Sequence, residues 1–179
     1  FERAKKLQDE GLEVDGFQAD ITDYDSINTA ITKIYEKYGK IDALVTAAGL
    51  GGPTMCDFTD DNAFEIRQTA MDVAVNGTWN TCRAVIPYMA KAKYGRIVTF
   101  SSVTGPTVTD PGMIAYGTSK GAVVAFTKAI AMEYAHLNIT ANSILPGSID
   151  TPLLSTMIQA QLPDYDPEEV KRMMGENIP

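Results

Sequence analysis

Three short apolar runs most constrain the fold of this chain of 179 residues. Each has the length of a strand and is apolar at successive positions, which is typical of parallel strands buried on both faces. The runs cover residues 41–48, 96–101 and 139–145, and helical patterns over residues 63–92 and 115–135 separate them. Strands that alternate with helices predict an α/β fold. We expect a doubly wound parallel sheet with helices on both faces (a Rossmann fold), because parallel strands need crossover connections.

The N-terminal part is predicted to hold a helix, a strand and a second helix. Residues 1–9 have the pattern of an amphipathic helix, and residues 12–19 have the composition of a strand. A further helix is predicted over residues 26–38, with isoleucines on one face. Asp25 is its expected N-cap and Gly39 its expected end, since these residue types favour those positions.

The whole chain, residues 1–179, is expected to form a single domain, because its length suits one ordinary domain. Its hydrophobic fraction of 45% and charged fraction of 21% are those of a soluble globular protein. No apolar run is long enough to span a bilayer, so a membrane protein is not expected. Residues 151–179 are rich in methionine and broken by prolines, which favours short helices that close over a site.

Charge and cysteine content argue against several classes of function. The formal net charge is −8, from 23 acidic and 15 basic residues, whereas domains that bind nucleic acid carry an excess of basic residues. Cys56 and Cys82 are too few for a disulfide framework or a zinc site and suit a reducing cytoplasm. The single histidine, His136, is expected to bind the last carbonyls of a helix. We therefore expect neither a metal site nor a mechanism based on histidine.

A serine pair and a Tyr-x-x-x-Lys motif flank the loop after the second apolar run. Ser101 is the last residue of that run and Ser102 follows it, and Tyr116 and Lys120 open the next helix. Residues at i and i+4 share one helix face, and an ammonium beside a phenol favours the phenolate. The tyrosine would then act as a general acid or base, with a serine hydroxyl on the same substrate oxygen. The motif alone is also compatible with a surface tyrosine packed on a lysine stem.

With these motifs in this order, the chain resembles the short-chain dehydrogenase/reductase family of nicotinamide-dependent oxidoreductases. The resemblance spans nearly all of the chain, and it identifies Ser102, Tyr116 and Lys120 with the family's catalytic residues. It also implies a set of cofactor-binding residues, from the adenine end to the nicotinamide end: Asp20, Ile21, Ala47, Ala48, Gly49, Tyr116, Lys120, Pro146, Gly147, Ile149 and Thr151.

The resemblance implies an oxidoreductase that uses NAD or NADP to interconvert a small alcohol and a ketone. Tyr116 would exchange a proton with the substrate oxygen while a hydride moves to or from the nicotinamide. Lys120 would bind the nicotinamide ribose, and Ser102 would orient the substrate oxygen. The family also implies a homodimer or homotetramer paired through the two long helices. Four residues are candidates for an apolar wall of the substrate pocket, although core packing explains each equally well: Pro106, Met113, Leu154 and Met157.

The chain departs from the family pattern at two places. Thr46 and Ala47 replace two asparagines after the first apolar run. In the long helix, Ala74 occupies the place of an asparagine that completes a catalytic tetrad. Asn76 lies about 200° around a regular helix from that position and is expected to face elsewhere. Replacing Ala74 by asparagine is predicted to raise turnover.

These departures leave a second interpretation open. The chain would then be a nucleotide-binding regulatory or scaffold protein that kept the fold and lost turnover. The missing asparagines favour this alternative, and the intact Ser102, Tyr116 and Lys120 oppose it. The family's glycine-rich turn and the residue that selects NAD or NADP are not found, so the chain resembles the middle of a longer protein.

Overall fold

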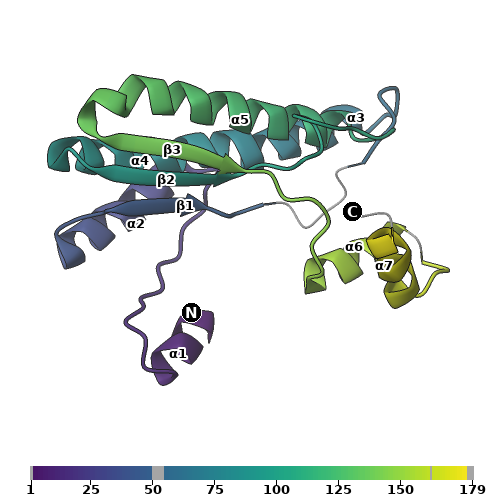
Figure 1. Cartoon of the computed structure of the whole chain (residues 1–179), viewed down its shortest axis with the longest axis horizontal. Coiled ribbons are helices and arrows are strands. Elements are labelled where there is room, and N and C mark those ends of the chain that lie inside the picture. Colours follow the sequence, from purple (N-terminus) through teal and green to yellow (C-terminus); the bar gives the residue numbers. More distant parts are fainter. Residues whose placement is uncertain (1, 50–54, 162, 177–179) are drawn as a thin grey trace.

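The computed structural model of the chain describes residues 2–49, 55–161 and 163–176. A parallel sheet of order β1-β2-β3 forms its centre (Figure 1). The strands are β1 (Ala43–Thr46), β2 (Gly95–Phe100) and β3 (Ile139–Ile144), which lie within the three predicted runs or within one residue of them. The predicted parallel α/β class is confirmed.

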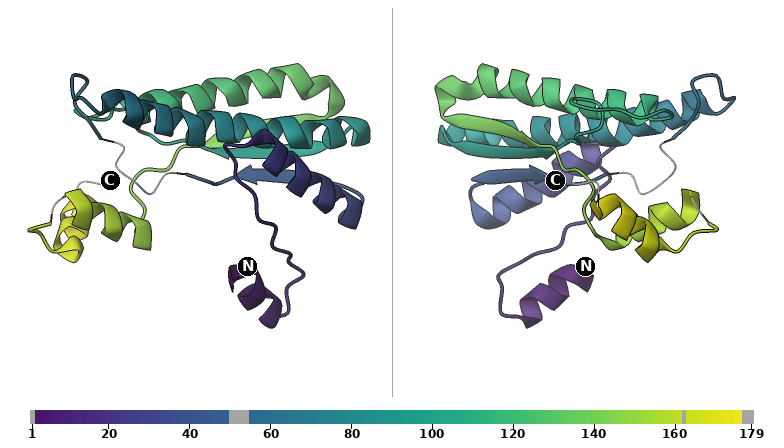
Figure 2. Two further views of the ribbon diagram at one scale, coloured as in Figure 1. Left: turned by 180° about the vertical axis from the view of Figure 1, so that it is seen from behind. Right: turned by 45° about the vertical axis from the view of Figure 1, so that its right-hand side comes forward.

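Three helices cover one face of the sheet: α2 (Tyr24–Tyr38), α4 (Gly77–Ala92) and α5 (Ile114–Tyr134). From behind, α2 and α4 lie in front of the strands (Figure 2). The two crossovers advance in the same direction across the sheet, and right-handed crossovers of that kind place their helices on the same face. In the described parts of the chain no helical layer covers the opposite face, where Val45 and Ile144 are about half exposed.

The hydrophobic core lies between this helical layer and the sheet. Alternate residues of β2 are buried, which is the period of two expected of a strand with one face covered. The main cluster joins α2, α4, β2 and β3 and contains Ile27, Ile31, Cys82, Ala84, Val85, Ile86, Met89, Ile97 and Ile139. Both cysteines are free and buried, and burial raises the pKa of Cys82 to about 12. No helix among the described residues is long and apolar enough to cross a membrane.

The N-terminal segment confirms one prediction and corrects another. Helix α1 (Glu2–Asp9) forms as predicted, and Phe1 lies outside the described residues. Residues 12–19, in contrast, form no strand. A strand needs a neighbour to accept its backbone hydrogen bonds, and in the described parts of the chain none lies beside this segment.

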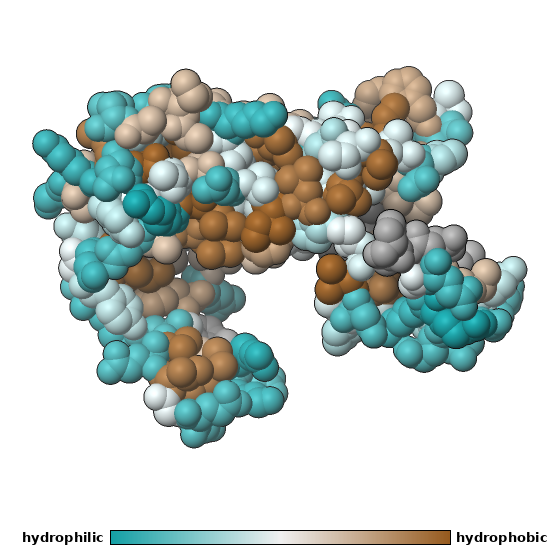
Figure 3. Space-filling model, in the orientation of Figure 1, coloured by the Kyte–Doolittle hydropathy of each residue, from teal (hydrophilic) through white to brown (hydrophobic). Residues whose placement is uncertain are grey.

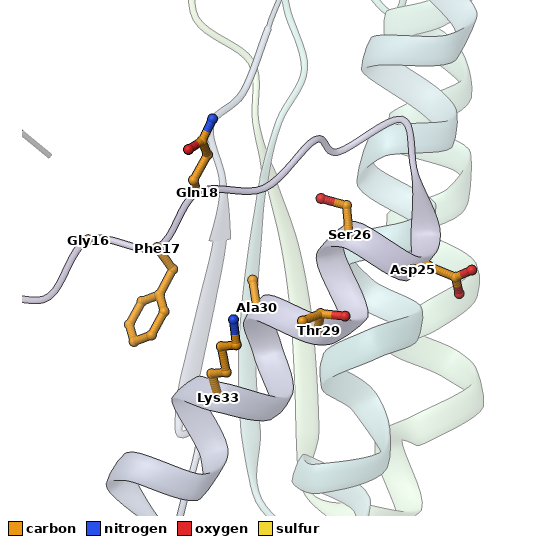
Figure 4. A pocket seen from close by; sticks show the side chains of 8 residues that line it. All are labelled: Gly16, Phe17, Gln18, Asp25, Ser26, Thr29, Ala30 and Lys33. Atoms are coloured by element: carbon orange, nitrogen blue, oxygen red, sulfur yellow. The ribbon is translucent and has the colours of Figure 1, made fainter.

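The same segment instead runs past α2. Asp15 binds the side chains of Lys37, at 2.5 Å, and Tyr38. A hollow of about 550 Å³ separates residues 16–18 from the first half of α2, and Figure 4 shows Phe17 and Lys33 projecting at its edge.

The ends of α2 confirm the predicted stop and correct the predicted start. Gly39 ends the helix in the left-handed conformation, with φ of +73°. The N-cap is Asp23 rather than Asp25: its backbone is extended, and its carboxylate accepts a hydrogen bond from the Asp25 N–H. Both residues are aspartates, so only the backbone conformation distinguishes the cap.

The predicted helix over residues 63–92 is divided into three parts. These are α3 (Ala63–Ala70), a π-helical segment η1 (Met71–Asn76) and α4. Widening to a π-helix rotates everything before it relative to α4, and such segments are frequent at functional sites.

Helix α5 is followed by a short 3₁₀ turn, η2 (Ala135–Leu137). His136 Nδ1 lies 3.1 Å from the Glu133 carbonyl oxygen, as predicted for a histidine at a helix end. The chain then forms β3 and two short helices, α6 (Pro152–Gln161) and α7 (Pro167–Glu176). Residues 162 and 177–179 of the predicted lid lie outside the described residues.

Candidate active site

The loops that follow the three strands meet at one edge of the sheet, because the strands are parallel. Hydrogen bonds join two of these loops directly. The Ser101 N–H donates to the Ile144 carbonyl at 2.9 Å, and the Val103 N–H donates to the Pro146 carbonyl at 3.0 Å. The serine loop after β2 and the Pro-Gly loop after β3 are thus held side by side.

A cavity of about 320 Å³ opens at this edge. Ser102 and Tyr116 both line it, although they come from different elements. Ser102 Oγ accepts a hydrogen bond from the Thr104 N–H at 3.1 Å, so the hydroxyl proton of Ser102 remains available to a ligand. The full lining is Ser102, Val103, Thr104, Met113, Tyr116, Gly147, Ser148, Ile149, Thr151, Leu153, Leu154 and Met157.

Lys120 lies one turn after Tyr116 on α5 and is attached to the end of β2. Its Nζ donates to the Phe100 carbonyl at 3.2 Å and lies 5.7 Å from the centre of the Tyr116 ring. Its own carbonyl accepts from Ser101 Oγ at 2.8 Å. Burial lowers the pKa of Lys120, because a low-dielectric environment disfavours the ammonium.

Two glycines bring the serine loop against the start of α5. Gly105 has φ of +104°, a conformation that side chains rarely adopt. A Cβ at Gly105 would lie 2.8 Å from Gly117 Cα and closer still to the Gly117 carbonyl oxygen. The close approach of Ser102 to the Tyr116 helix therefore depends on the absence of a side chain at residue 105.

A second, smaller cavity of about 110 Å³ lies beside the end of β1. Ile21, Ala47 and Ala48 line it together with residues of β1, α2 and α4. Asn80 Nδ2 donates to the Ile21 carbonyl at 3.0 Å, and the Ile21 side chain packs on Gly77. The sequence carries no signal for the role of Asn80, because only the fold brings residues 80 and 21 together.

Comparison with known proteins decides the family. A model of the short chain dehydrogenase family matches residues 2–162. The chain belongs to the short-chain dehydrogenase family. Oxidoreductase UcpA of Salmonella typhimurium is 41% identical over 179 residues, which cover 98% of this chain and 66% of that protein. The chain thus spans slightly less than two thirds of the length of that relative.

Solved structures of short-chain dehydrogenases share the fold. NAD⁺-bound xylitol dehydrogenase superposes with a TM-score of 0.85 at 27% identity, covering 99% of this chain and 70% of that one. A gluconate 5-dehydrogenase from Burkholderia cenocepacia, in complex with NADP and tartrate, superposes with a TM-score of 0.80 at 27% identity. That match covers 92% of this chain and 61% of the other.

The structure distributes the residues that resemble the family's site over two cavities. Ser102, Tyr116, Gly147, Ile149 and Thr151 line the larger one, and Ile21, Ala47 and Ala48 line the smaller one. Met113, Leu154 and Met157 of the predicted apolar wall line the larger cavity, whereas Pro106 does not. Leu153 belongs to the segment 151–179 that was predicted to close over the site, although it was not named individually; its position one helical turn before Met157 is the signal that would have identified it. Three further lining residues were not named as site residues: Val103, Thr104 and Ser148.

Four predicted site residues line neither cavity: Asp20, Gly49, Lys120 and Pro146. Lys120 and Pro146 lie directly behind the larger cavity through the hydrogen bonds described above. Asp20 is exposed, and its carboxylate accepts from the N–H and hydroxyl of Thr22 at 2.8 and 2.7 Å. These hydrogen bonds lower the pKa of Asp20. The Asp20 carboxylate thus stabilises the local turn at residues 20–22.

The departures from the short-chain dehydrogenase pattern have visible consequences. Ala74 is buried within η1, whereas Asn76 is exposed and donates to Asp72 Oδ1 at 2.8 Å. The π-helical segment therefore does not turn Asn76 inward. Thr46 Oγ1 is buried and has no hydrogen-bond partner among the described residues. The effect of asparagine at residue 74 on turnover stays a prediction.

Proposed function

We propose that this chain carries the catalytic residues of a dehydrogenase or reductase that interconverts an alcohol and a carbonyl compound with NAD or NADP. One observation carries the proposal: Ser102 and Tyr116 line the same cavity, and Lys120 is fixed beside the tyrosine ring. The family supports the reaction class, since UcpA is named an oxidoreductase.

The residues of the cavity have distinct roles in carbonyl reduction. The Ser102 hydroxyl donates a hydrogen bond to the substrate oxygen, since its oxygen already accepts from the Thr104 N–H. Tyr116 gives its phenolic proton to the same oxygen as negative charge develops there. Alcohol oxidation runs the same steps in reverse, with the Tyr116 phenolate taking the proton.

The role proposed for Lys120 is to place a positive charge beside the Tyr116 ring, with its Nζ 5.7 Å from the ring centre. Its ammonium is fixed by the Phe100 carbonyl and cannot turn freely away from the ring. A cation held near a phenol stabilises the phenolate and lowers the cost of proton transfer. Lys120 also marks where ribose hydroxyls would bind.

The loops at this edge fit a dinucleotide. Ala47, Ala48 and Gly49 follow β1, and a Cβ at Gly49 or Gly147 would meet no atom of the described residues within 4 Å. Ile21, Ala47, Ala48 and Gly49 would hold the adenosine end, with Asp20 beside it. The nicotinamide end would lie against Pro146, Gly147, Ile149 and Thr151. When bound, the nicotinamide supplies or accepts the hydride. Both cofactors stay open, since the xylitol dehydrogenase was solved with NAD⁺ and the gluconate dehydrogenase with NADP.

The assembly proposed is a homodimer or homotetramer paired through α4 and α5. A groove of about 390 Å³ lies between these helices, where the Trp79 and Phe126 rings are 5.1 Å apart. Trp79 is 53% exposed in the single chain. Tryptophan side chains are enriched at protein interfaces, so a second copy of the chain would cover this ring. Sedimentation of wild type and Trp79→Glu tests this proposal, and the variant should be monomeric. A cytoplasmic location is proposed from the two free cysteines.

The test of the reaction uses the full gene product. Fluorescence titration with NADH and NADPH measures cofactor binding, and a screen of ketones and alcohols then measures turnover. We expect binding of one cofactor and turnover that is lost in Tyr116→Phe. Binding with no turnover on any substrate would instead identify a nucleotide-binding regulatory or scaffold protein.

A further inference from the structure

Resting on the proposed function, we propose that the larger cavity selects an uncharged, compact ketone or secondary alcohol with an apolar body. Substrates that carry a carboxylate or phosphate would be excluded. The proposal rests on the lining of the cavity, on the position of the nearest charged groups and on the helix that forms its outer wall.

The lining of the cavity combines hydroxyl groups with apolar side chains. Five of the lining residues carry hydroxyl groups, and two of these, Ser102 and Tyr116, would bind the reacting oxygen; the others are Thr104, Ser148 and Thr151. Six aliphatic or thioether side chains also line the cavity: Val103, Met113, Ile149, Leu153, Leu154 and Met157. Among the described residues that line it, none carries a charge. A substrate anion would lose its hydration there without gaining a counter-charge, which is costly.

The charged residue between two lining residues, Asp150 between Ile149 and Thr151, is already paired. Lys171 binds Asp150 and Glu168, each at 2.8 Å, and its side chain is only 15% exposed. With two carboxylates on one ammonium, this cluster is net negative and offers no cation to an acidic substrate. The Lys120 ammonium, on the opposite side, is fixed by the Phe100 carbonyl.

Helix α6 provides the outer wall and therefore the selectivity. Leu153, Leu154 and Met157 lie at i, i+1 and i+4, so residues 153 and 157, and 154 and 157, are neighbours on one face. Met157 adds a flexible thioether that adapts to apolar bodies of different shape. The cavity of about 320 Å³ holds roughly ten water volumes, and part of it borders the Pro-Gly loop, so the substrate must be compact.

A matched pair of substrates tests the proposal. Methyl 3-oxocyclohexanecarboxylate and the free 3-oxocyclohexanecarboxylate share the ketone and the ring and differ in charge. With the full gene product and either NADH or NADPH, kcat/KM is expected to be at least tenfold higher for the ester. An equal or higher value for the acid would overturn the proposal. So would a higher kcat/KM for xylitol than for cyclohexanol in the oxidative direction.

A binding measurement separates this proposal from the proposed function. Saturation-transfer NMR of the same two ketones reports contact with the protein without any reaction. Contact by the ester and not by the acid supports the proposed selectivity of the cavity, whether or not the ester reacts. If the ester binds in this way and neither ketone is turned over, only the proposed function fails. Contact by the acid alone, or by both equally, overturns the selectivity.

A charge placed on α6 should change the preference. Met157→Lys is expected to raise kcat/KM for the acid relative to the ester by at least tenfold, because it adds the missing cation. Thr156→Lys adds the same charge to an exposed position of the same helix that does not line the cavity, so the ratio should stay unchanged. If Met157→Lys does not fold, Leu153→Lys replaces it, since Leu153 is 47% exposed. Unchanged ratios in the folded variants would contradict the proposal.

Discussion

The two walls of the larger cavity are built differently. The inner wall, β2 with the serine loop and α5, is part of the packed layer. The Lys120–Phe100 and Ser101–Lys120 hydrogen bonds and the contact of Gly105 with Gly117 fix it. The outer wall, α6 with α7, lies apart from the sheet and its helices (Figures 1 and 2). An ion pair from Lys171 to Asp150 attaches it to the loop after β3.

In the proposed mechanism, the inner wall carries the proton transfer and the outer wall selects the substrate. Proton transfer needs a donor and an acceptor held to within a fraction of an ångström, which a packed wall provides. Selection of an apolar body needs only a surface of the right size and polarity, which a less firmly attached wall can present. Figure 3 shows the same contrast: apolar surface over the sheet layer, and a largely hydrophilic outer side on the C-terminal helices.

The largest effect is expected from removal of the proposed proton donor, Tyr116, in the inner wall. Tyr116→Phe should lower kcat by about 10²- to 10⁴-fold, the usual contribution of a general acid or base, and leave the urea midpoint unchanged. Tyr165→Phe is the matched control, because Tyr165 is exposed in the loop between α6 and α7. Comparable activity of the two variants would place the chemistry elsewhere.

The next prediction concerns the close packing of the inner wall at Gly105. Gly105→Ala should destabilise the protein by about 3 kcal/mol, because the new Cβ overlaps the Gly117 backbone and φ is positive. Gly121→Ala should stabilise it by roughly 0.5–1 kcal/mol, since that helical glycine has open space around its Cβ position. Urea unfolding measures both. Equal free energies of unfolding for the two variants would mean that the contact of Gly105 with Gly117 does not stabilise the packing of the serine loop on α5.

A smaller effect concerns the buried ammonium of the inner wall. Burial lowers the pKa of Lys120 below its value in the unfolded chain, near 10.5. The unfolded state then binds more protons between the two pKa values, so this group's contribution to stability rises as the pH rises through that window. In Lys120→Met the contribution is absent. Urea unfolding at several pH values measures the free energy of unfolding of wild type and of Lys120→Met. The wild-type value minus the variant value should increase toward high pH. A difference that does not change with pH would argue against a desolvated lysine.

The smallest effect is expected from removal of the ion pair between Lys171 and Asp150, which attaches the outer wall. Lys171→Met should raise the KM of the ketone substrate by about three- to tenfold with little change in kcat. Stability should change by less than about 1 kcal/mol, because ion pairs near the surface contribute little. Arg172→Met removes the neighbouring pair with Glu176 on the same helix and should leave KM unchanged. Equal KM values for the two variants would show that the tie to Asp150 does not position α6.

Much of the fold followed from local patterns. The strands and α5 lie within two residues of their predicted bounds, because buried runs and helical periodicity are properties of neighbouring residues. The prediction failed for residues 12–19, whose composition suits a strand that has no partner in the described structure. It also missed η1, since a π-helical turn depends on how a helix packs and has no clear local signature.

A row of hydroxyls across the covered face illustrates the limit of local reasoning. The strand register aligns Thr46 with Thr99 and Thr99 with Ser143. Thr127 donates to the Val123 carbonyl at 2.7 Å, so the 2.8 Å contact between Thr99 and Thr127 has Thr99 as its donor. Thr46 Oγ1 and Ser143 Oγ have no partner among the described residues. Nothing in the separate strand sequences distinguishes these three environments.

The sequence by itself determined the order of strands and helices and the spacing of Tyr116 and Lys120. Both follow from short-range geometry, because one helical turn joins residues four apart wherever the helix lies. Only the tertiary structure decided which loop meets that helix, how Asn80 supports Ile21, and that the described residues lining the cavity beside Ser102 carry no charge. These contacts join residues far apart in the chain, so they depend on strand order, crossover handedness and the fit of one glycine against another.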